Sequence, residues 1–495
     1  MKQLLVIAAS VIYSLATAQT LPYKENFRPQ FHFSPVKNWL NDPNGLVYQE
    51  GAYHLFYQYN PFGTKWGHMS WGHAVSKDLV IWKELPVALS EINDIMIFSG
   101  SAVLDKNNSA GFAKNAKDET LVAIYTAHQE NLKQAQHLAF SNDKGNTWTH
   151  YDKNPVLDQN KKDFRDPQVF WYEKDKKWIM ALAEPYLHQI SFFNSTDLKK
   201  WNYLHSFGPA GDTSAVWECP SLFLAPVIGQ PDQKKWVLLV SQNSSMQYFT
   251  GDFDGTQFYS DEPAANIKRP DDGPDYYAAI TYNDLPANAK PTSIGWINSW
   301  NYANEIPTTS WRGAMSIPRE LALKKIGNSW RLMQSPVPAI KNLRKNGGTV
   351  QPLSFEGRKD IALTGQQFEI ILEIDLSSAS EAGIIVGKGS VNETLIGYDK
   401  TKKTLYIDRS RSGDISFAKN FGKRYEAPLS LTGNRIRLQL YFDKSIIEVF
   451  ANDGEAVMTA QIFPTAADNK VQLYSNGGPA RFTGLEYWAM ESIWK

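Results

Sequence analysis

Residues 76–82 read Ser-Lys-Asp-Leu-Val-Ile-Trp, and the chain repeats this pattern. Residues 195–201 read Ser-Thr-Asp-Leu-Lys-Lys-Trp, and residues 141–148 carry a looser copy that starts Ser-Asn-Asp and ends in Trp. Each copy follows one run of aromatic and β-branched residues and precedes another, which is the signature of strands. Recurrence at intervals of about 50 to 65 residues is typical of the blades of a β-propeller.

A second series of turns marks where the predicted units start. The same position is taken in successive units by Asp42-Pro43, Ser99-Gly100, Asp166-Pro167, Glu218-Cys219-Pro220 and Asp275. Five units therefore start near residues 42, 99, 166, 218 and 275. Because propellers have about four to eight blades, we predict a five-bladed β-propeller over residues 27–333. A β-sandwich with chance repetition is the alternative.

The composition changes after this region. Thirteen of the 16 Trp lie between residues 39 and 311, and none lies between residues 331 and 487. Residues 334–338, Gln-Ser-Pro-Val-Pro, are typical of a linker, which we place at 334–345. Residues 436–442 then alternate apolar and polar side chains, as a half-buried antiparallel strand does. We predict a β-sandwich over residues 346–495, so the whole fold is expected to be all-β.

The first 18 residues have the pattern of a secretory signal peptide. Lys2 precedes apolar runs at residues 4–9 and 11–15, and Ala16-Thr17-Ala18 is a small-x-small cleavage site. We expect cleavage after Ala18 and a secreted or periplasmic protein. The apolar run is shorter than the about 20 residues that a membrane anchor needs, so no membrane association is predicted. An N-terminal strand or a buried helix is the alternative.

Charge and cysteine content argue against several classes of protein. Lys+Arg and Asp+Glu both number 51, so binding of nucleic acid or anionic membranes by net attraction is not expected. The single cysteine, Cys219, allows no intramolecular disulfide and no cysteine-based metal cluster. The nine His show no zinc-binding spacing. We predict no metal and no cofactor, and the sequence does not indicate an oligomeric state.

Three of the predicted turns carry carboxyl groups. Asp42, Asp166 and Glu218 hold the same position in their units, just before the strand expected to line the central channel. We therefore expect them to converge at one mouth of that channel, where close like charges raise at least one pKa. An ionised carboxylate beside a protonated carboxyl group is the pair that glycoside hydrolysis needs. An Asx turn before a strand is the alternative for each of them.

The neighbouring residues suit a sugar ligand. Flat aromatic faces and hydrogen-bonding groups for hydroxyls are offered by Trp39, Trp66, Trp71, Trp300, Asn41, Gln58 and Arg165. For each Trp, packing in the core is the alternative. Cys219 is interpreted as a buried, inert thiol, and Asp275 as a structural residue that supports the channel rim.

A set of short motifs follows the same order as in a known family. They read Trp-Leu-Asn-Asp-Pro-Asn-Gly at 39–45, Gln-Tyr-Asn-Pro at 58–61, Phe-Ser-Gly-Ser at 98–101, Phe-Arg-Asp-Pro at 164–167, Trp-Glu-Cys-Pro at 217–220, Trp-Asn-Tyr-Ala at 300–303 and Pro-Arg-Glu-Leu at 318–321. Together they resemble the glycoside hydrolase family 32 β-fructosidases, which include invertases, inulinases and levanases. The resemblance covers residues 30–490, and Leu40 departs from it, because the family usually has Met there.

The resemblance implies a role for each acid. Asp42 is expected to be the nucleophile, Glu218 the general acid and base, and Asp166 the stabiliser of the transition state. The implied fructose pocket consists of Asn41, Gln58, Trp66, Phe98, Ser99, Arg165 and Trp300. The family retains the anomeric configuration, which implies a carboxyl separation of about 5–5.5 Å between nucleophile and acid.

The expected activity is exo hydrolysis that releases terminal fructose from sucrose, inulin and levan. One competing hypothesis is an inverting arabinan-type propeller glycosidase, whose carboxyl separation is about 6.5–9.5 Å. A fructosyltransferase with the same site is a second hypothesis, and a non-catalytic fructan-binding homologue is a third. The sequence does not indicate which of the three fructosides is preferred.

Overall fold

The computed structural model describes residues 22–115, 119–129 and 133–494. The predicted signal peptide and its cleavage site after Ala18 lie outside the described residues. Among those described, no helix is long and apolar enough to cross a membrane. Strands account for most of the described residues, and the helices within those residues are two short 3₁₀ turns, η1 (Pro185–Leu187) and η2 (Pro338–Leu343).

The N-terminal part is a five-bladed β-propeller, which confirms the predicted fold. Blade 1 comprises β1 (Asn38–Gln49), β2 (Ala52–Asn60), β3 (Ser70–Ser76) and β4 (Trp82–Leu89), with β20 (Trp311–Arg312) paired in parallel to β1. Blade 2 comprises β5 (Ile95–Asp105), β6 (Thr120–Gln129), β7 (Gln134–Ser141), β8 (Thr149–His150) and β9 (Leu157–Lys161). Blade 3 comprises β10 (Arg165–Tyr172), β11 (Lys177–Glu184), β12 (Gln189–Ser195) and β13 (Asn202–Phe207).

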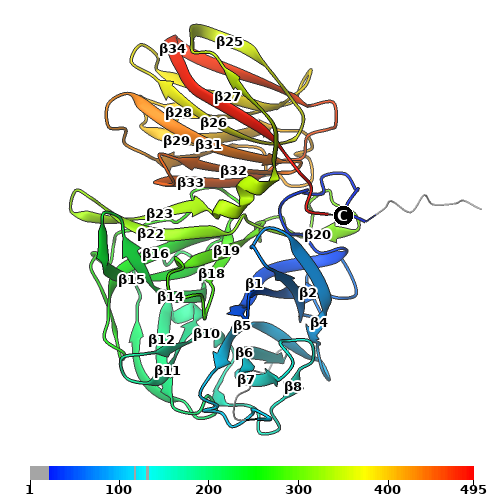
Figure 1. Ribbon diagram of the computed structural model, residues 1–495, viewed down its shortest axis with the longest axis vertical. Coiled ribbons are helices and arrows are strands. Elements are labelled where there is room, and N and C mark those ends of the chain that lie inside the picture. Colours follow the sequence, from blue (N-terminus) through cyan, green and yellow to red (C-terminus); the bar gives the residue numbers. More distant parts are fainter. Residues whose placement is uncertain (1–21, 116–118, 130–132, 495) are drawn as a thin grey trace, which may run out of the picture.

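The last two blades complete the ring. Blade 4 comprises β14 (Trp217–Val227), β15 (Gln230–Gln242), β16 (Ser245–Phe253) and β17 (Phe258–Ser260). Blade 5 comprises β18 (Tyr277–Thr281), β19 (Thr292–Ile297), β21 (Ala314–Met315), β22 (Arg319–Ile326) and β23 (Ser329–Pro336). The first strands contact one another in the order β1, β5, β10, β14, β18 and back to β1, so they surround one central channel (Figure 1).

The repeated Ser-x-Asp sequence forms a turn between the third and fourth strands of a blade. In blade 1 the Asp78 carboxylate accepts hydrogen bonds from the backbone N–H groups of Val80 and Ile81. In blade 3 the Asp197 carboxylate accepts the same pair of bonds from residues 199 and 200. The side chain thus satisfies backbone donors that the sheet leaves unpaired, which explains why the pattern recurs in the blades.

The C-terminal part is a β-sandwich, also as predicted, and lies on one side of the propeller (Figure 1). Its strands are β24 (Arg344–Val350), β25 (Leu353–Thr364), β26 (Gln367–Asp375), β27 (Glu381–Lys388), β28 (Glu393–Asp399), β29 (Thr404–Arg411), β30 (Arg424–Pro428), β31 (Arg435–Asp443), β32 (Ile446–Ala451), β33 (Ala456–Gln461) and β34 (Lys470–Met490). The long strand β34 pairs with β27 near its start and with β26 near its end, so it belongs to both layers. Apolar side chains from both layers form one core between them.

Buried ion pairs join the two parts. Arg319 of the propeller contacts Asp271 and also Glu448 of the sandwich, and the three side chains are buried. The interface therefore has charged groups at its centre, and charges buried in this way are stable only when paired. The proposed bounds of propeller, linker and sandwich remain 27–333, 334–345 and 346–495, although β23 of the propeller ends at Pro336 and β24 of the sandwich begins at Arg344, inside the proposed linker.

Asp275 differs from its expected place at the channel rim. Its Oδ2 atom lies 2.6 Å from Nη1 of Arg409 in the sandwich and accepts a hydrogen bond from the backbone of Gln461. Asp275 precedes β18 by two residues and turns toward the sandwich, so it joins the two parts of the molecule instead of lining the channel. Its role is structural, as expected, but at another location.

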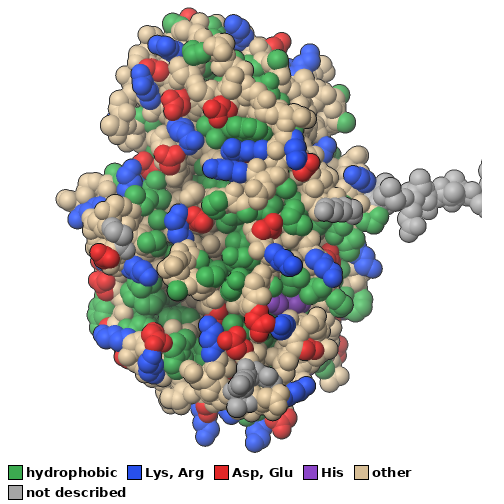
Figure 2. All heavy atoms as spheres, viewed as in Figure 1, with side chains coloured by type: hydrophobic (Ala, Val, Ile, Leu, Met, Phe, Trp, Pro, Cys, Tyr) green, Lys and Arg blue, Asp and Glu red, His purple; other side chains and the backbone are tan. Residues whose placement is uncertain are grey.

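Charged groups of both signs are mixed on the surface. Figure 2 shows Lys and Arg side chains interspersed with Asp and Glu side chains over the face that it views. This distribution agrees with the equal numbers of basic and acidic residues in the chain.

Candidate active site

A cavity of about 370 Å³ opens at the mouth of the propeller channel. It is lined by Asn41, Asp42, Gln58, Trp66, Phe98, Ser99, His128, Gln134, Asp163, Arg165, Asp166, Glu218 and Trp300. The three expected catalytic acids and the seven residues of the implied fructose pocket are all in this set, whereas Trp39 and Trp71 are not. The structure therefore brings together side chains that are up to 259 positions apart, from Asn41 to Trp300.

Bulges in the first strands aim the acids into the cavity. The pairing register shifts between Leu40 and Pro43 in β1, between Arg165 and Gln168 in β10 and between Glu218 and Ser221 in β14. The first strands β5 and β18 shift register at the corresponding places. A bulge leaves residues unpaired and turns a side chain out of its alternating position. Proline, which lacks an N–H to donate, fits such a position, and this explains the Asp-Pro and Cys-Pro sequences.

Asp42 lies next to Ser99 and Cys219, which both contact its Oδ2 atom. Ser99 donates its hydroxyl to Asp42 Oδ2 at 2.8 Å, and the Cys219 Sγ atom lies 3.6 Å from the same oxygen. Oδ1 is buried and has no hydrogen-bond partner among the described residues. Burial raises the pKa of Asp42, and the charge of Glu218 adds to the effect. Ser99 and Cys219 thus fix Oδ2 but not Oδ1.

Asp166 lies beside Asp42 and shares a neighbour with it. Its Oδ2 atom accepts a hydrogen bond from the backbone N–H of Cys219 at 3.0 Å, and Cys219 Sγ lies 3.6 Å away. Burial and the nearby charge of Glu218 raise the pKa of Asp166 to about 7, although Arg165 acts in the opposite direction. Asp166 can therefore retain a proton up to about neutral pH.

Glu218 is the most exposed of the three acids and is held by two donors. Arg165 donates from Nε to Glu218 Oε1 at 3.0 Å, and the Tyr277 hydroxyl donates to Oε2 at 2.5 Å. Its side chain keeps 21% of its accessible surface, against 8% for the whole residue at Asp42. Glu218 can therefore meet solvent or a leaving group while Asp42 stays at the bottom of the cavity.

Cys219 is buried beneath the acids, in agreement with the expected inert thiol. Burial raises the pKa of the Cys219 thiol well above its usual range, and the neighbouring charges of Asp166 and Asp42 reinforce this. The group therefore stays protonated and serves as a weak donor between two carboxylates rather than as a partner of Glu218.

Trp66 and Trp300 form apolar walls at the rim, where they keep 41% and 38% of their accessible surface. Phe98 adds a third aromatic face and stacks on His128 with ring centroids 4.3 Å apart. The expectation that Trp39 and Trp71 offer faces to a ligand is wrong, since both are fully buried in the blades. The indole N–H of Trp71 donates to the backbone carbonyl of Phe98. The indole N–H of Trp39 donates to Asn41 Oδ1 at 2.7 Å and so orients the Asn41 side chain.

Sequence reasoning missed several residues of the site. Gln134 Oε1 accepts hydrogen bonds from the backbone of Phe164 at 2.8 Å and from Arg165 Nη1 at 3.3 Å. Asp163 accepts a further bond from Arg165 Nη1 at 2.8 Å, so two residues fix the guanidinium that holds Glu218. Two of the missed residues could have been found from the sequence. Asp163 precedes the Phe-Arg-Asp-Pro motif, and Tyr277 is the first residue of β18, the first strand of blade 5. Gln134 and His128 have no such signal, because they come from the ends of the second and third strands of blade 2.

No metal-binding cluster is present in the part of the chain that the structure describes. Groups of three or more His, Cys, Asp or Glu side chains with suitable placement are absent there. The expectation that the protein needs no metal or cofactor remains a prediction.

Comparisons with known proteins identify the family. Residues 32–336 match the family described as "Glycosyl hydrolases family 32 N-terminal domain", and residues 339–489 match "Glycosyl hydrolases family 32 C terminal". The chain belongs to glycosyl hydrolase family 32. Both the propeller, which holds the cavity, and the sandwich are thus parts of one family architecture.

Relatives within family 32 are similar over nearly the whole chain. A levanase from Bacillus subtilis is 45% identical over 98% of this chain and 73% of its own length. An extracellular exo-inulinase from Aspergillus awamori is 39% identical over 98% of this chain and 99% of its own length. The crystal structure of the A. awamori exo-inulinase superposes with a TM-score of 0.90 at 38% identity, covering 96% of this chain and all of that one. A β-fructofuranosidase from Schwanniomyces occidentalis, solved with fructosyl-erythritol, reaches 0.83 at 30% identity over 96% and 99% of the two chains.

Proposed function

We propose that this glycoside hydrolase is a retaining β-fructofuranosidase that removes terminal fructose from sucrose, inulin and levan. The observation that carries the proposal is the meeting of Asp42, Asp166 and Glu218 in one cavity of about 370 Å³. Relatives that span the chain are named levanase and exo-inulinase, which supports β-fructosides as substrates. The proposed residue roles are those that the family resemblance implies.

In the first step Asp42 attacks the anomeric carbon of the terminal fructosyl unit. A new bond forms between Asp42 Oδ1 and that carbon while the bond to the leaving oxygen breaks. Glu218 gives its proton to the leaving oxygen, so the released sugar departs as a neutral alcohol. The unpaired Oδ1 of Asp42 and the greater exposure of Glu218 support this division of roles.

In the second step a water molecule replaces the leaving sugar. Glu218, now ionised, takes a proton from the water, whose oxygen bonds to the anomeric carbon as the bond to Asp42 breaks. Fructose leaves with its original configuration, and both carboxyl groups return to their starting states. A carboxyl separation of about 5–5.5 Å remains a prediction of this assignment.

Asp166 and Arg165 assist without forming a bond to the sugar. Hydroxyl groups of a bound fructosyl unit can donate to Asp166 and stabilise its ionised form. The ionised carboxylate of Asp166 then stabilises the positive charge that develops on the fructosyl unit in the transition state. Arg165 contacts Glu218 and holds its carboxyl group in position.

The shape of the cavity favours exo action. Asp42 and Asp166 are buried at its base, while Trp66 and Trp300 stand at its rim. A chain end can enter such a cavity, whereas an internal unit would need an open groove through it. We therefore propose release of single fructose units.

We also propose that the protein acts outside the cytoplasm, either secreted or in the periplasm. The signal-peptide pattern of residues 1–18 supports this, as does the word extracellular in the name of the A. awamori relative.

Product analysis tests the proposed function. The full chain is incubated separately with sucrose, inulin and levan, and early products are resolved by size. Fructose as the only new small product from inulin and levan is expected, while a ladder of oligosaccharides contradicts exo action. Longer fructosides formed from concentrated sucrose would instead indicate a fructosyltransferase, and no products from any substrate would indicate a non-catalytic binding protein.

A further inference from the structure

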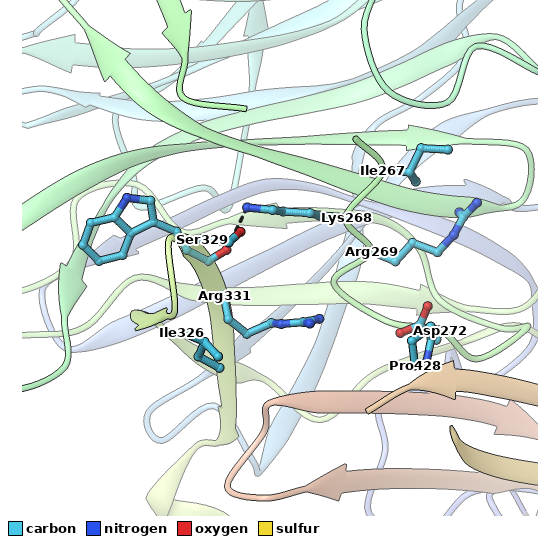
Figure 3. A pocket seen from close by; sticks show the side chains of 9 residues that line it. Ile267, Lys268, Arg269, Asp272, Ile326, Ser329, Arg331 and Pro428 are labelled. Atoms are coloured by element: carbon cyan, nitrogen blue, oxygen red, sulfur yellow. Dashed lines mark hydrogen bonds between the residues drawn. The ribbon is translucent and has the colours of Figure 1, made fainter. Parts of the chain in front are cut away.

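The propeller and the sandwich do not meet evenly along their boundary. Near Arg269 and Pro428 a cavity of about 430 Å³ lies between residues of both parts (Figure 3). Elsewhere, aromatic and charged side chains of the sandwich pack directly against residues 298–310, which connect β19 with β20. We call residues 298–310 the Trp300 loop. The sandwich therefore contacts a segment whose Trp300 lines the catalytic cavity.

Trp300 is held partly by other indoles and partly by the backbone of its loop. Its ring centroid lies 6.0 Å from that of Trp39 and 4.8 Å from that of Trp296. The backbone N–H of Tyr302 donates to the carbonyl of Ser299 at 3.0 Å, so Trp300 lies inside a tight turn. Because Trp300 still keeps 38% of its accessible surface, its place at the cavity also depends on how that turn is held.

Tyr302 joins this turn to the sandwich. Its hydroxyl donates to Asp275 Oδ1 and accepts a hydrogen bond from Arg409 Nη2 at 2.8 Å. The Tyr302 ring also contacts Phe421, with ring centroids 5.2 Å apart. A buried side chain two positions after Trp300 thus makes both polar and apolar contacts with the sandwich.

Arg409 has one well-defined geometry in this contact. Its side chain is fully buried, and its Nη1 atom pairs with Asp275 Oδ2 at 2.6 Å. Its Nε atom donates to the backbone carbonyl of Phe421 at 2.9 Å, and the guanidinium carbon lies 3.7 Å from the centroid of the Phe421 ring. A buried charge is stable only when it is paired and hydrogen-bonded, so these contacts fix the guanidinium. Arg409 therefore fixes both the Tyr302 hydroxyl and the Phe421 ring.

We propose that Arg409 and Phe421 of the sandwich are positioning residues for Trp300 and act through Tyr302. The inference rests on the proposed function, in which Trp300 forms a wall of the fructosyl site. A displaced wall weakens contacts with the sugar equally in the ground state and in the transition state, so KM rises while kcat changes little. The sandwich thereby contributes to binding of the terminal unit, although the residues that line the catalytic cavity belong to the propeller.

Steady-state kinetics of the full-length protein with sucrose test the inference. Tyr302→Phe removes the hydroxyl that Arg409 holds, and Phe421→Leu removes the aromatic contact from the sandwich side. Each variant is expected to raise KM about fivefold and to keep kcat within about twofold of the wild type. Arg409→Lys keeps the charge opposite Asp275 but loses the planar guanidinium, so it is expected to act in the same direction. Thermal melting checks that each variant is folded.

Arg344→Lys is the matched control for Arg409→Lys. Arg344 also pairs with a buried carboxylate, that of Glu369, and also stacks on an aromatic ring, that of Trp488. Both of these partners belong to the sandwich. The control variant is therefore expected to keep the KM and kcat of the wild type.

A double-mutant cycle shows whether the effect passes through Trp300. Trp300→Ala removes the wall itself, so adding Tyr302→Phe to it should give no further rise in KM. An additive rise overturns the inference, as does an unchanged KM in both Tyr302→Phe and Phe421→Leu, or an equal rise in Arg344→Lys. Each of these results leaves the proposed function intact. Failure of the wild type to hydrolyse sucrose, inulin and levan overturns the proposed function instead.

Discussion

Asp42 is buried beside another carboxylate, and this has a consequence for the pH dependence of activity. Burial and the charge of Glu218 raise the pKa of Asp42 above its ordinary value of 3.8. Because the nucleophile must be ionised, activity falls when the pH drops below this raised pKa. We expect the acidic limb of kcat/KM for sucrose to lie clearly above pH 3.8, as measured by initial rates across the acidic range. An acidic limb at or below that value would contradict the assignment.

Gln134 is predicted to act as a positioning residue. Its Oε1 atom accepts hydrogen bonds from the backbone N–H of Phe164 and from the Arg165 guanidinium, and Arg165 in turn donates a hydrogen bond to Glu218. Gln134→Met keeps the side-chain length but removes the acceptor, so we expect kcat to fall about tenfold with a smaller change in KM. Steady-state kinetics with sucrose measure both constants. Gln134→Glu, which restores an acceptor, is expected to recover part of the loss, and an unchanged kcat in Gln134→Met would contradict the role.

Individual side chains show where the sequence is informative. The acids stand out because each lies near the start of a first strand and is followed, directly or after one residue, by a proline in the strand bulge. Trp39 and Trp71 were wrongly expected to face a ligand, because sequence does not distinguish an indole at the rim from one packed between strands. Gln134 and His128 reach the cavity only through the closure of the ring, which no local pattern reveals.

The Ser-x-Asp turns support the blades. Asp197 accepts hydrogen bonds from the backbone of Lys199 and Lys200 and from the Ser195 hydroxyl. Removing this carboxylate leaves those donors to solvent, so Asp197→Ala is expected to lower the free energy of unfolding by about 1–2 kcal/mol. Chemical denaturation measures the change. Because the turn lies outside the catalytic cavity, kcat should not change, and wild-type stability of the variant would contradict the structural role.

The blades were predictable because several of them repeat the Ser-x-Asp sequence. This sequence recurs because the Asp carboxylate accepts hydrogen bonds from backbone N–H groups of the turn. The pairing of β20 with β1 was not predictable, because it joins segments about 270 residues apart through two short contacts. The bulges were visible only indirectly, as prolines close after the acids. The strand alternation at residues 436–442 correctly indicated β31 of the sandwich.

The two parts of the molecule are joined by a buried charge network with its own pH dependence. His32 lies 2.8 Å from Asp443 and 3.0 Å from Glu448, and Arg319 also pairs with Glu448. Burial alone would lower the pKa of His32, but hydrogen bonds to both carboxylates raise it to about 9. The raised value means that the stabilisation is complete below the ordinary pKa of 6.5 and is lost as the pH rises through about 9.

We therefore expect the protein to lose roughly 3 kcal/mol of stability between pH 6.5 and 9 from this group. Melting temperatures measured across that range should fall with rising pH. His32→Gln should be less stable at pH 6.5 and should show a flatter dependence. Equal slopes for the variant and the wild type would contradict the assignment of the effect to His32.

The central claim is that Asp42 forms a covalent bond with the fructosyl unit, and trapping this intermediate tests it most directly. Glu218→Ala is mixed with a fructoside whose leaving group departs without protonation, quenched rapidly, digested and analysed by mass spectrometry. The variant removes the general base, so the second step should slow by roughly 10³-fold or more and the intermediate should accumulate. We predict one fructosyl group on the peptide that contains Asp42, and none after the additional change Asp42→Asn. Turnover without this adduct, giving fructose of inverted configuration, would contradict the account.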